Sequence, residues 1–349
     1  MGNRRSFVRS HRLLIQLRYP AVLLGALILL GITGCSKEGS QTSASNAPGH
    51  KRTIVFVFKV AGISYSAACR RGAEEAAKKL GINVEYMAPQ QALADMQRDM
   101  IETQIVRHPD AIVISPDDSE AIKPVIAEAM RKGIKVFTWD SDSKTSQRIF
   151  YVAAVDDVQI GEDIANALAK AINYKGKVLI MSGGRGADNL NKHVDGMEMA
   201  FSKYPGITVI KPVLYNDDDK SKAVNMAIEA LQQHPNVAGI ACANSPSPPA
   251  CGEALERTGK VGKVKVWGLA LPSETRPYLK NGSVTGLYLW DPAQLTYLAA
   301  VLVNNDLSGH PPVNGETLDH VGKITYKDGQ VTLPIRLTIT KQNVDQFNF

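Results

Sequence analysis

The stretch IVRHPDAIVIS, residues 105–115, has a counterpart later in the chain in ALQQHPNVAGIA, residues 230–241. In both, a helical pattern ends at a His-Pro pair and an apolar run follows it. Because the residue before a proline is disfavoured in the helical region, His108 and His234 are expected to end helices at turns, with no catalytic role. The two stretches indicate that one structural unit occurs twice.

The residues around the first stretch alternate between strand and helix patterns. Short apolar runs rich in β-branched and aromatic residues predict strands, and longer amphipathic or alanine-rich segments predict helices. In chain order these are TIVFVF (53–58), GAEEAAKKLG (72–81), INVEYM (82–87), 93–107, AIVIS (111–115), 119–132 and IKVFTW (134–139). This alternation predicts a parallel sheet covered by helices on both faces.

The second half of the chain repeats the order of the first. Its landmarks are KVLIMS (177–182), GMEMAFSKYPG (196–206), ITVIKP (207–212), the His-Pro stretch and GKVKVWGLA (262–270). We therefore predict an α/β protein of two similar three-layer lobes with parallel sheets. Since ligands bind at the carboxyl ends of parallel strands, two such lobes facing each other predict a cleft between them.

The N-terminal segment has the features of a secretory signal. Residues 1–34 combine five arginines and no acidic residue with an apolar run, Ala21 to Ile32, that is short for a membrane-spanning helix. The run ends in Ile32-Thr33-Gly34-Cys35, which resembles the lipobox of bacterial lipoproteins. The resemblance implies that Cys35 becomes the lipid-bearing first residue, anchored at the periplasm or cell surface. The alternative is an ordinary signal anchor with an incidental cysteine.

Charge and cysteine content narrow the function further. The chain has 40 basic and 34 acidic residues, and loss of the five arginines leaves 35 against 34. With no basic stripe remaining, the sequence argues against nucleic-acid binding. Residues 35–51 predict a flexible tether. Cys242 and Cys251 either pair in an oxidising compartment or remain small buried hydrophobes. Since no metal-ligand spacing is present, we expect neither metal nor cofactor.

Polar and aromatic side chains follow several of the predicted strands. Asp140 and Asp142 come directly after IKVFTW, and if that strand stays extended both acids point to the same side. The candidate ligand-binding residues are Lys59, Tyr65, Asp140, Asp142, Asp188, Asn189, Asn244, Trp290 and Asp291. Carboxylates, amides and a lysine hydrogen-bond to hydroxyl groups, and aromatic rings pack on C–H faces. The set therefore predicts a small sugar as the ligand.

Several of these residues also have a structural interpretation. Asp142 and Asp291 suit caps of the following loop or helix, and Asp188 and Asn189 suit a helix N-terminus. Trp139 suits a core position as well as the cleft, and Tyr65 suits a residue that covers the first helix.

From about residue 52 to 349 the chain resembles a type I periplasmic binding protein. The resemblance is carried by WDSD (139–142), GLALPSETRPYLKNGSV (268–284) and LWDPAQLTYLAA (289–300). It is most similar to the rhamnose-binding and autoinducer-2-binding branch of sugar ABC importers. This implies a monomer whose lobes close on one ligand about a hinge. It also implies delivery to a permease and an ATPase that are separate chains.

The resemblance also implies domain limits and ligand positions. It implies three crossings between lobes, near 153–156, 289–291 and 332–338. The N-terminal lobe then comprises 52–154 with 291–334, and the C-terminal lobe 155–290 with 335–349. The positions at which members of this branch hold ligands correspond here to Lys59, Asp140, Asp188, Asn189 and Asn244.

Departures from the family pattern favour some ligands over others. Ribose-type members carry aromatics after the first strand, where this chain has Tyr65 and then Ser66, and an aspartate where it has Leu269-Ala270. Autoinducer-2 binders carry a proline-aspartate-alanine run near Cys242, and glutamine at Asn189. A hexose or deoxy sugar is therefore the expected ligand. An autoinducer-2-like signal or a chemosensory receptor partnership is the alternative.

An enzyme is the main rival class. Two carboxylates at a strand end could suit a glycosidase. However, the sequence has no nucleophile elbow and no zinc motif, so we expect a binding protein without catalysis.

Overall fold

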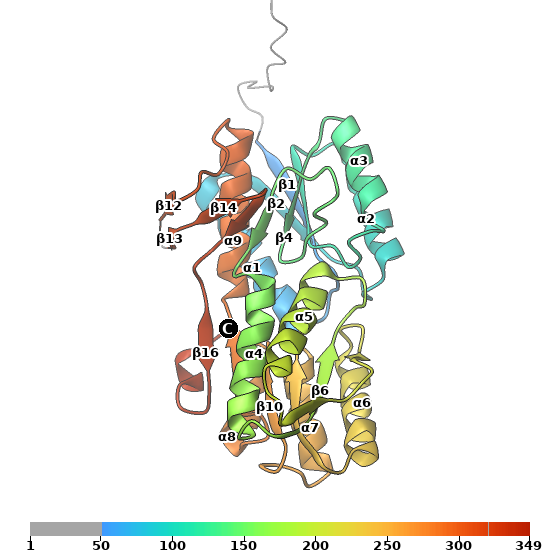
Figure 1. The fold of residues 1–349 in the computed structure, drawn as a ribbon. Coiled ribbons are helices and arrows are strands. Elements are labelled where there is room, and N and C mark those ends of the chain that lie inside the picture. The colour runs from blue at the N-terminus through green and yellow to red at the C-terminus, as the bar shows by residue number, and fades with distance from the viewer. Residues whose placement is uncertain (1–50, 320) are drawn as a thin grey trace, which may run out of the picture. The chain divides into compact units, whose positions relative to one another are not determined.

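The computed structural model describes residues 51–319 and 321–349, so the predicted signal, the lipidated Cys35 and most of the tether lie outside the described residues. Two large mixed sheets, each flanked by helices, form two lobes (Figure 1). This is the predicted two-lobed α/β fold. Within the described residues, no helix is long and apolar enough to cross a membrane.

The sheet of the first lobe is parallel except for one hairpin at its edge. Its strand order is β14-β15-β5-β4-β3-β1-β2. The strands are β1 (Thr53–Val57), β2 (Asn83–Met87), β3 (Ala111–Ile114), β4 (Lys135–Trp139), β5 (Tyr151–Ala153), β14 (Thr325–Lys327) and β15 (Gln330–Thr332). The hairpin β14–β15 turns at Asp328 and Gly329, both with positive φ, as the Asp-Gly pair predicts.

Two helix pairs cover this sheet. Helices α1 (Ser64–Leu80) and α9 (Pro292–Leu307) pack together on one face, and α2 (Ala94–Arg107) and α3 (Lys123–Arg131) pack together on the other. Alternate residues of the central strands serve the two faces. In β1, Ile54 and Phe56 join the core under α1, and Val55 and Val57 join the core under α2. A continuous apolar strand therefore fills both cores.

The sheet of the second lobe has the order β16-β11-β10-β9-β6-β7, and β8 also pairs with β6. The strands are β6 (Gly176–Ser182), β7 (Ile207–Val209), β8 (Leu214–Tyr215), β9 (Val237–Cys242), β10 (Lys265–Gly268), β11 (Gly286–Leu289) and β16 (Leu337–Ile339). The helices are α4 (Asp157–Ala171), α5 (Asp188–Ser202), α6 (Lys220–Gln233), α7 (Ser247–Arg257) and α8 (Pro272–Asn281). A small ladder of β12 (Thr317–Leu318) and β13 (Gly322–Lys323) precedes the β14–β15 hairpin.

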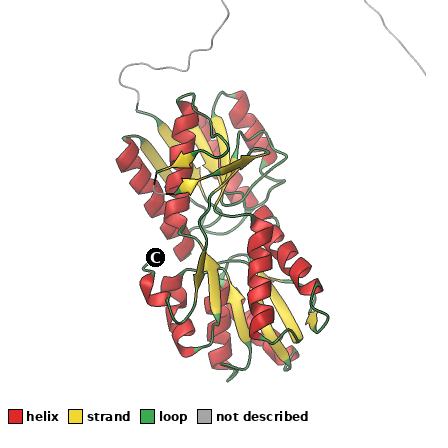
Figure 2. Cartoon of the chain, turned by 60° about the vertical axis from the view of Figure 1, so that its left-hand side comes forward, coloured by secondary structure: helices red, strands yellow, loops and turns green. Residues whose placement is uncertain are grey.

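The chain passes between the two sheets three times. It leaves β5 of the first sheet for α4 in the second lobe through residues 154–156, and returns from β11 to α9 through 290–291. It then crosses again from β15 to β16 through 333–336. These connecting segments run between the two lobes in Figure 2.

Both His-Pro pairs end helices. His108 is the C-cap of α2 with positive φ, and its Nε2 lies 2.9 Å from the carbonyl oxygen of Lys132. His234 is the C-cap of α6. The predicted structural role of the two histidines is confirmed.

Candidate ligand-binding site

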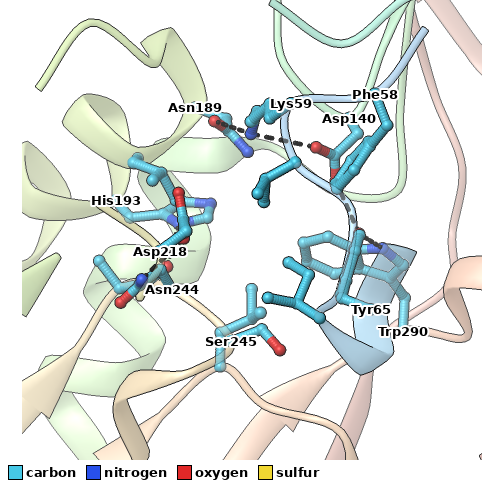
Figure 3. Close-up of a pocket in the computed structure, with 15 residues that line it drawn as sticks. Phe58, Lys59, Tyr65, Asp140, Asn189, His193, Asp218, Asn244, Ser245 and Trp290 are labelled. Carbon is cyan, nitrogen blue, oxygen red and sulfur yellow. Dashed lines mark hydrogen bonds and ion pairs between the residues drawn. The ribbon is translucent and has the colours of Figure 1, made fainter. Parts of the chain in front are cut away.

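A cavity of about 410 Å³ lies where residues of the two lobes meet (Figure 3). The first lobe and the β11–α9 crossing contribute Phe58, Lys59, Val60, Ile63, Tyr65, Asp140 and Trp290. The second lobe contributes Asn189, Leu190, His193, Asp218, Ala243, Asn244, Ser245 and Leu269. This volume counts all the space between the lining atoms, including space that is open to solvent.

Asp140 follows the last residue of β4 in the left-handed region, with φ of 63°. This conformation is tolerated by aspartate and turns the chain away from the strand direction. Its Oδ1 accepts from the Tyr65 hydroxyl at 2.7 Å, and its Oδ2 accepts from Ser115 Oγ at 2.9 Å. Lys59 Nζ lies 3.2 Å from the same Oδ2. Buried Asp140 is thus held in place by three protein groups, with room for one more donor.

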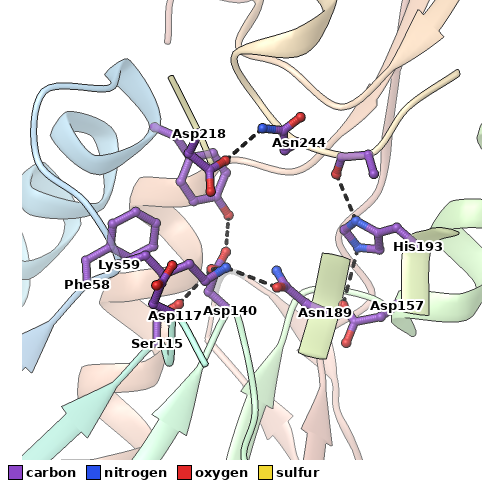
Figure 4. A network of polar contacts seen from close by, with 12 residues as sticks. Phe58, Lys59, Ser115, Asp117, Asp140, Asp157, Asn189, His193, Asp218 and Asn244 are labelled. Carbon is purple, nitrogen blue, oxygen red and sulfur yellow. Dashed lines mark hydrogen bonds and ion pairs between the residues drawn. The ribbon is translucent and has the colours of Figure 1, made fainter. Parts of the chain in front are cut away.

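Lys59 joins the two lobes (Figure 4). Besides Asp140, its ammonium donates to Asn189 Oδ1 at 3.0 Å, across from the first lobe to the first turn of α5. Two of the three ammonium protons are used in this way, and one remains for a ligand in the cavity. The amide nitrogen of Asn189 is likewise left as a donor.

Three aromatic rings form one wall of the cavity. Phe58 and Tyr65 are stacked with ring centroids 5.9 Å apart, and Trp290 meets Tyr65 edge-on at 6.5 Å. The Trp290 indole N–H donates to the Tyr65 hydroxyl at 2.9 Å, and that hydroxyl donates to Asp140. Burial and the Asp140 carboxylate raise the pKa of Tyr65 well above its ordinary value, so the hydroxyl keeps its proton as a donor.

The opposite wall is organised by Asn244, which follows β9. Its amide nitrogen donates to Asp218 Oδ1 at 2.8 Å and to Asn216 Oδ1 at 2.9 Å. Ser247 Oγ donates to its amide oxygen. Since both amide protons are used within the second lobe, Asn244 positions Asp218 more than it offers donors to a ligand.

Asp218 is 8% exposed, and its Oδ2 has no side-chain partner among the described residues. Gly183 makes room for the carboxylate, because a Cβ there would lie 2.5 Å from Asp218 Oδ1. Burial raises the pKa of Asp218, which Lys59, Asn244 and the Gly184 backbone N–H partly offset. The cavity therefore contains a buried acceptor that a ligand donor would satisfy.

A second buried carboxylate lies in the loop after β3. Asp117 is 7% exposed, its backbone N–H donates to Gln97 Oε1, and its Oδ1 has no partner among the described residues. Burial raises the pKa of Asp117 to about 6, with Asp218 adding to the shift and Lys59 opposing it. Asp117 does not line the cavity, although a Cβ on Gly184 of the second lobe would lie 3.3 Å from its Oδ1.

His193 and Tyr151 connect the cavity to the first crossing between the lobes. His193 Nδ1 donates to the Ala243 carbonyl at 3.0 Å, and its Nε2 lies 3.5 Å from Asp157 Oδ1. The Tyr151 hydroxyl lies 3.2 Å from Asp157 Oδ2 and 3.1 Å from the Asp140 carbonyl oxygen. These contacts join the first crossing to residues of both lobes.

The structure places six of the nine predicted residues on the cavity: Lys59, Tyr65, Asp140, Asn189, Asn244 and Trp290. The other three lie outside its lining. Asp142 accepts from two of the Arg148 nitrogens, Nε at 2.8 Å and Nη2 at 2.7 Å, and from Thr138 Oγ1. Asp188 pairs with Lys192 at 2.5 Å, and Asp291 caps α9 through the Ala293 N–H.

The expectation that Asp140 and Asp142 point to the same side is wrong. It assumed an extended strand, whereas the left-handed Asp140 ends β4 and sends Asp142 toward Arg148. Trp139, for which two roles were open, is fully buried in the core against Phe56.

Sequence reasoning missed Asp218, His193, Phe58 and the aliphatic residues of the cavity. The acidic run Asp217-Asp218-Asp219 was the available signal for Asp218, but it follows β8, which has only two residues and leaves no periodic pattern. Phe58 read as part of the first strand. His193 lies inside a helix, where spacing alone does not distinguish a cavity residue from a core residue.

The arrangement is suited to binding. It offers one ammonium, two carboxylates, two amides, an imidazole and two hydroxyls, beside the rings of Phe58, Tyr65 and Trp290. Within residues 51–319 and 321–349, no group of three or more His, Cys, Asp or Glu side chains is placed to hold a metal ion.

Comparison with known proteins agrees with the fold. The model of the periplasmic binding protein domain matches residues 54–311. The D-allose-binding periplasmic protein of Escherichia coli is 26% identical over 249 residues, which cover 68% of this chain and 79% of that protein.

Two solved structures are also similar. An ABC transporter solute-binding protein of Burkholderia graminis in complex with D-arabinose has a TM-score of 0.75 and 30% identity, covering 85% of this chain and 98% of that one. Another, from Clostridium phytofermentas with bound L-rhamnose, has a TM-score of 0.80 and 26% identity, with the same coverage of both chains. The resemblance seen in the sequence is confirmed. The chain belongs to the periplasmic binding protein family, among the sugar-binding solute-binding proteins of ABC transporters, which act outside the cytoplasm and are not enzymes.

Proposed function

We propose that this protein captures a small neutral sugar, a hexose or deoxy sugar, in the cavity between its lobes and delivers it to an ABC importer. It acts as a lipid-anchored monomer held through Cys35, and it is not itself an enzyme. The permease and the ATPase are separate chains.

The observation that carries the proposal is the pairing of two opposite walls. Lys59, Asp140, Asn189 and Asp218 offer both donors and acceptors to hydroxyl groups, and Phe58, Tyr65 and Trp290 offer ring faces and edges to C–H groups. Hydrogen bonds to charged groups contribute about 1.5–3 kcal/mol each. Three or four of them, after association costs, correspond to micromolar affinity, about −8 kcal/mol.

An aliphatic part of the lining favours a deoxy sugar within this class. Val60, Ile63, Leu190, Leu269 and Ala243 surround the cavity with carbon atoms that offer no hydrogen bond. A sugar that carries a methyl group in place of a hydroxymethyl group gains binding free energy from this apolar contact, about 0.8 kcal/mol per buried CH₂. Matched sugar pairs therefore distinguish the two: L-rhamnose against L-mannose, and L-fucose against L-galactose.

The test is a binding screen of the purified full chain. Pentoses, hexoses, deoxy sugars and autoinducer-2 are each added, the shift of Tm is recorded, and every compound that raises Tm is measured by calorimetry. We expect one or a few sugars to bind with micromolar or tighter affinity, and the Asp140→Ala variant to keep its fold and lose the shift. If only autoinducer-2 binds, the ligand is a signal, and if no compound of the panel binds, the sugar proposal fails.

The anchor is tested separately. Metabolic labelling with a fatty-acid analogue should mark the wild-type protein and leave the Cys35→Ala variant unlabelled. An equally labelled variant would exclude lipidation at Cys35 without affecting the sugar proposal.

A further inference from the structure

Two cysteines of the second lobe lie in contact beneath the cavity. Cys242 is the last residue of β9 and Cys251 lies in α7, and their Sγ atoms are 3.7 Å apart. Both side chains are fully buried, and Met181 Sδ lies 4.0 Å from Cys251 Sγ. The sequence alone left open whether the two pair, whereas the fold brings them within van der Waals distance.

The segment between the two cysteines forms part of the cavity wall. Residues 243–250 separate them, and the first three of these, Ala243, Asn244 and Ser245, line the cavity. Asn244 orients the Asp218 carboxylate, and the Ala243 carbonyl accepts from His193. A bond between the cysteines would therefore close a short loop that contains these three cavity residues and holds the contacts to Asp218 and His193.

We propose that Cys242 and Cys251 are joined by a disulfide in the mature protein, and that this cross-link fixes the cavity-lining segment Ala243–Ser245. The structure records two free thiols with their sulfurs 3.7 Å apart, and a disulfide requires them to approach to about 2.05 Å. The family acts outside the cytoplasm, where disulfides form and persist. The proposal is independent of which sugar the cavity takes.

The bond forms by exchange with a protein disulfide of a thiol oxidoreductase. One cysteine thiolate attacks a sulfur of the oxidant and releases the first oxidant thiol. The thiolate of the second cysteine then attacks the sulfur of the first cysteine in the mixed disulfide. It releases the second oxidant thiol, so two protein thiols become one disulfide and the oxidant disulfide becomes a dithiol.

Because both sulfurs are buried in the folded protein, we expect the exchange to take place during folding. In the folded lobe, both sulfurs are shielded from an oxidant, and burial together with the neighbouring Cys251 raises the pKa of Cys242 well above its ordinary value. Thiols in this state react slowly. Oxidation is therefore expected before α7 packs against β9, and the finished bond is then protected from reductants.

The sequence provides a convenient mapping experiment. Trypsin cuts after Lys222 and Arg257, with no site between, so both cysteines fall in the single peptide 223–257. Buried Cys69 falls in peptide 60–70 and serves as an internal control. Full-length protein from the cell envelope is denatured in acid, alkylated without reduction and digested.

We expect peptide 223–257 to carry no alkyl group and to be lighter by two hydrogen atoms, and to gain two alkyl groups only after reduction. Peptide 60–70 should be alkylated in both cases. The Cys251→Ser variant should leave Cys242 open to alkylation, and the matched Cys69→Ser variant should keep the cross-link. Two alkyl groups on peptide 223–257 before reduction would overturn the proposal.

A separate measurement tests whether the cross-link fixes the cavity-lining segment. Hydrogen exchange of peptides covering 243–250 is compared between the oxidised and the reduced wild-type protein, with peptides covering 111–115 as the reference. Exchange should accelerate several-fold in 243–250 on reduction and stay unchanged in the reference. Equal exchange in both states would show that the bond does not fix the cavity segment.

Discussion

Asp218 and Asp217 are neighbours with the same left-handed backbone and different surroundings. Asp218 lines the cavity with an Oδ2 that lacks a side-chain partner, and Asp217 lies at the surface beside Lys222. Aspartate tolerates this conformation, which lets the turn present one acid inward and one outward. The pair gives a test of the site at the level of a single carboxylate.

We expect Asp218→Asn to weaken sugar binding by about ten- to a hundred-fold, because one charge-assisted hydrogen bond is lost. Asp217→Asn is the matched control and should leave affinity unchanged. Isothermal titration with the best sugar of the panel provides the measurement. Equal affinities of the two variants would remove Asp218 from the site.

Asp117 predicts a pH dependence of stability. Below its ordinary pKa of 3.8, Asp117 keeps its proton in both the native and the unfolded state, so its ionisation does not lower the free energy of unfolding. As pH rises toward about 6, the unfolded state loses its proton first, so the free energy of unfolding falls by about 3 kcal/mol in total. Asp117→Asn should lack this fall.

Urea unfolding of the wild type and the variant between pH 4 and pH 7 measures the difference. Asp95→Asn is the control, since Asp95 is exposed at the start of α2, where its Oδ1 accepts from the Met96 N–H. Parallel stability curves of Asp117→Asn and the wild type would show that Asp117 is not buried as a raised-pKa group.

At the scale of elements, the approach of α4 to α5 decides where the second-lobe wall lies. Two glycines permit it, because a Cβ on Gly161 would lie 2.0 Å from the His193 carbonyl oxygen, and one on Gly196 would lie 2.1 Å from that of Val158. The first turn of α5 carries Asn189, which pairs with Lys59. Spacing between the helices therefore sets the distance across the cavity.

Gly196→Ala should force the helices apart and lower the free energy of unfolding by about 1–3 kcal/mol, and it should weaken sugar affinity through the displaced Asn189. Ser202→Ala, on the exposed last turn of the same helix, is the control and should change neither. Chemical unfolding and titration calorimetry check both. A Gly196→Ala protein with wild-type stability would contradict the close packing.

The elements were more predictable than the site. Strands buried on both faces read as apolar runs, and duplicated His-Pro ends marked equivalent helices, so the two lobes followed from the sequence. Which acid faces the cavity depended on one backbone angle at Asp140 and on an arginine six residues beyond Asp142. Neither the backbone angle at Asp140 nor the pairing with Arg148 can be recognised from a periodic pattern in the sequence. Asp218 was hidden for the same reason, since it follows a two-residue strand.

At the scale of the whole molecule, direct contacts between the lobes accompany the cavity. Lys59 meets Asn189, the Ser119 N–H donates to the Gly186 carbonyl, and Ser64 Oγ donates to Glu274 Oε1 at 2.6 Å. The last pair joins the first turns of α1 and α8 without lining the cavity. In the proposed function, in which the lobes close on the ligand, this pair stabilises the closed arrangement independently of the ligand.

Glu274→Ala should reduce sugar affinity about two- to five-fold by raising the dissociation rate, because it removes one hydrogen bond from the closed state only. Glu253→Ala, which removes an exposed pair with Arg257 on α7, is the control. Stopped-flow fluorescence measures the rates. An unchanged dissociation rate would show that the Ser64–Glu274 contact has no part in closure.

The three crossings have a mechanical consequence. A single connecting segment would let one lobe rotate freely against the other. Three separate connecting segments allow bending about one axis and resist sliding and twisting of the lobes. If the protein captures and releases a sugar as proposed, the three crossings return the opposing walls to the same alignment in every cycle. A protease that cuts one crossing would leave both halves associated, but with this guided motion lost.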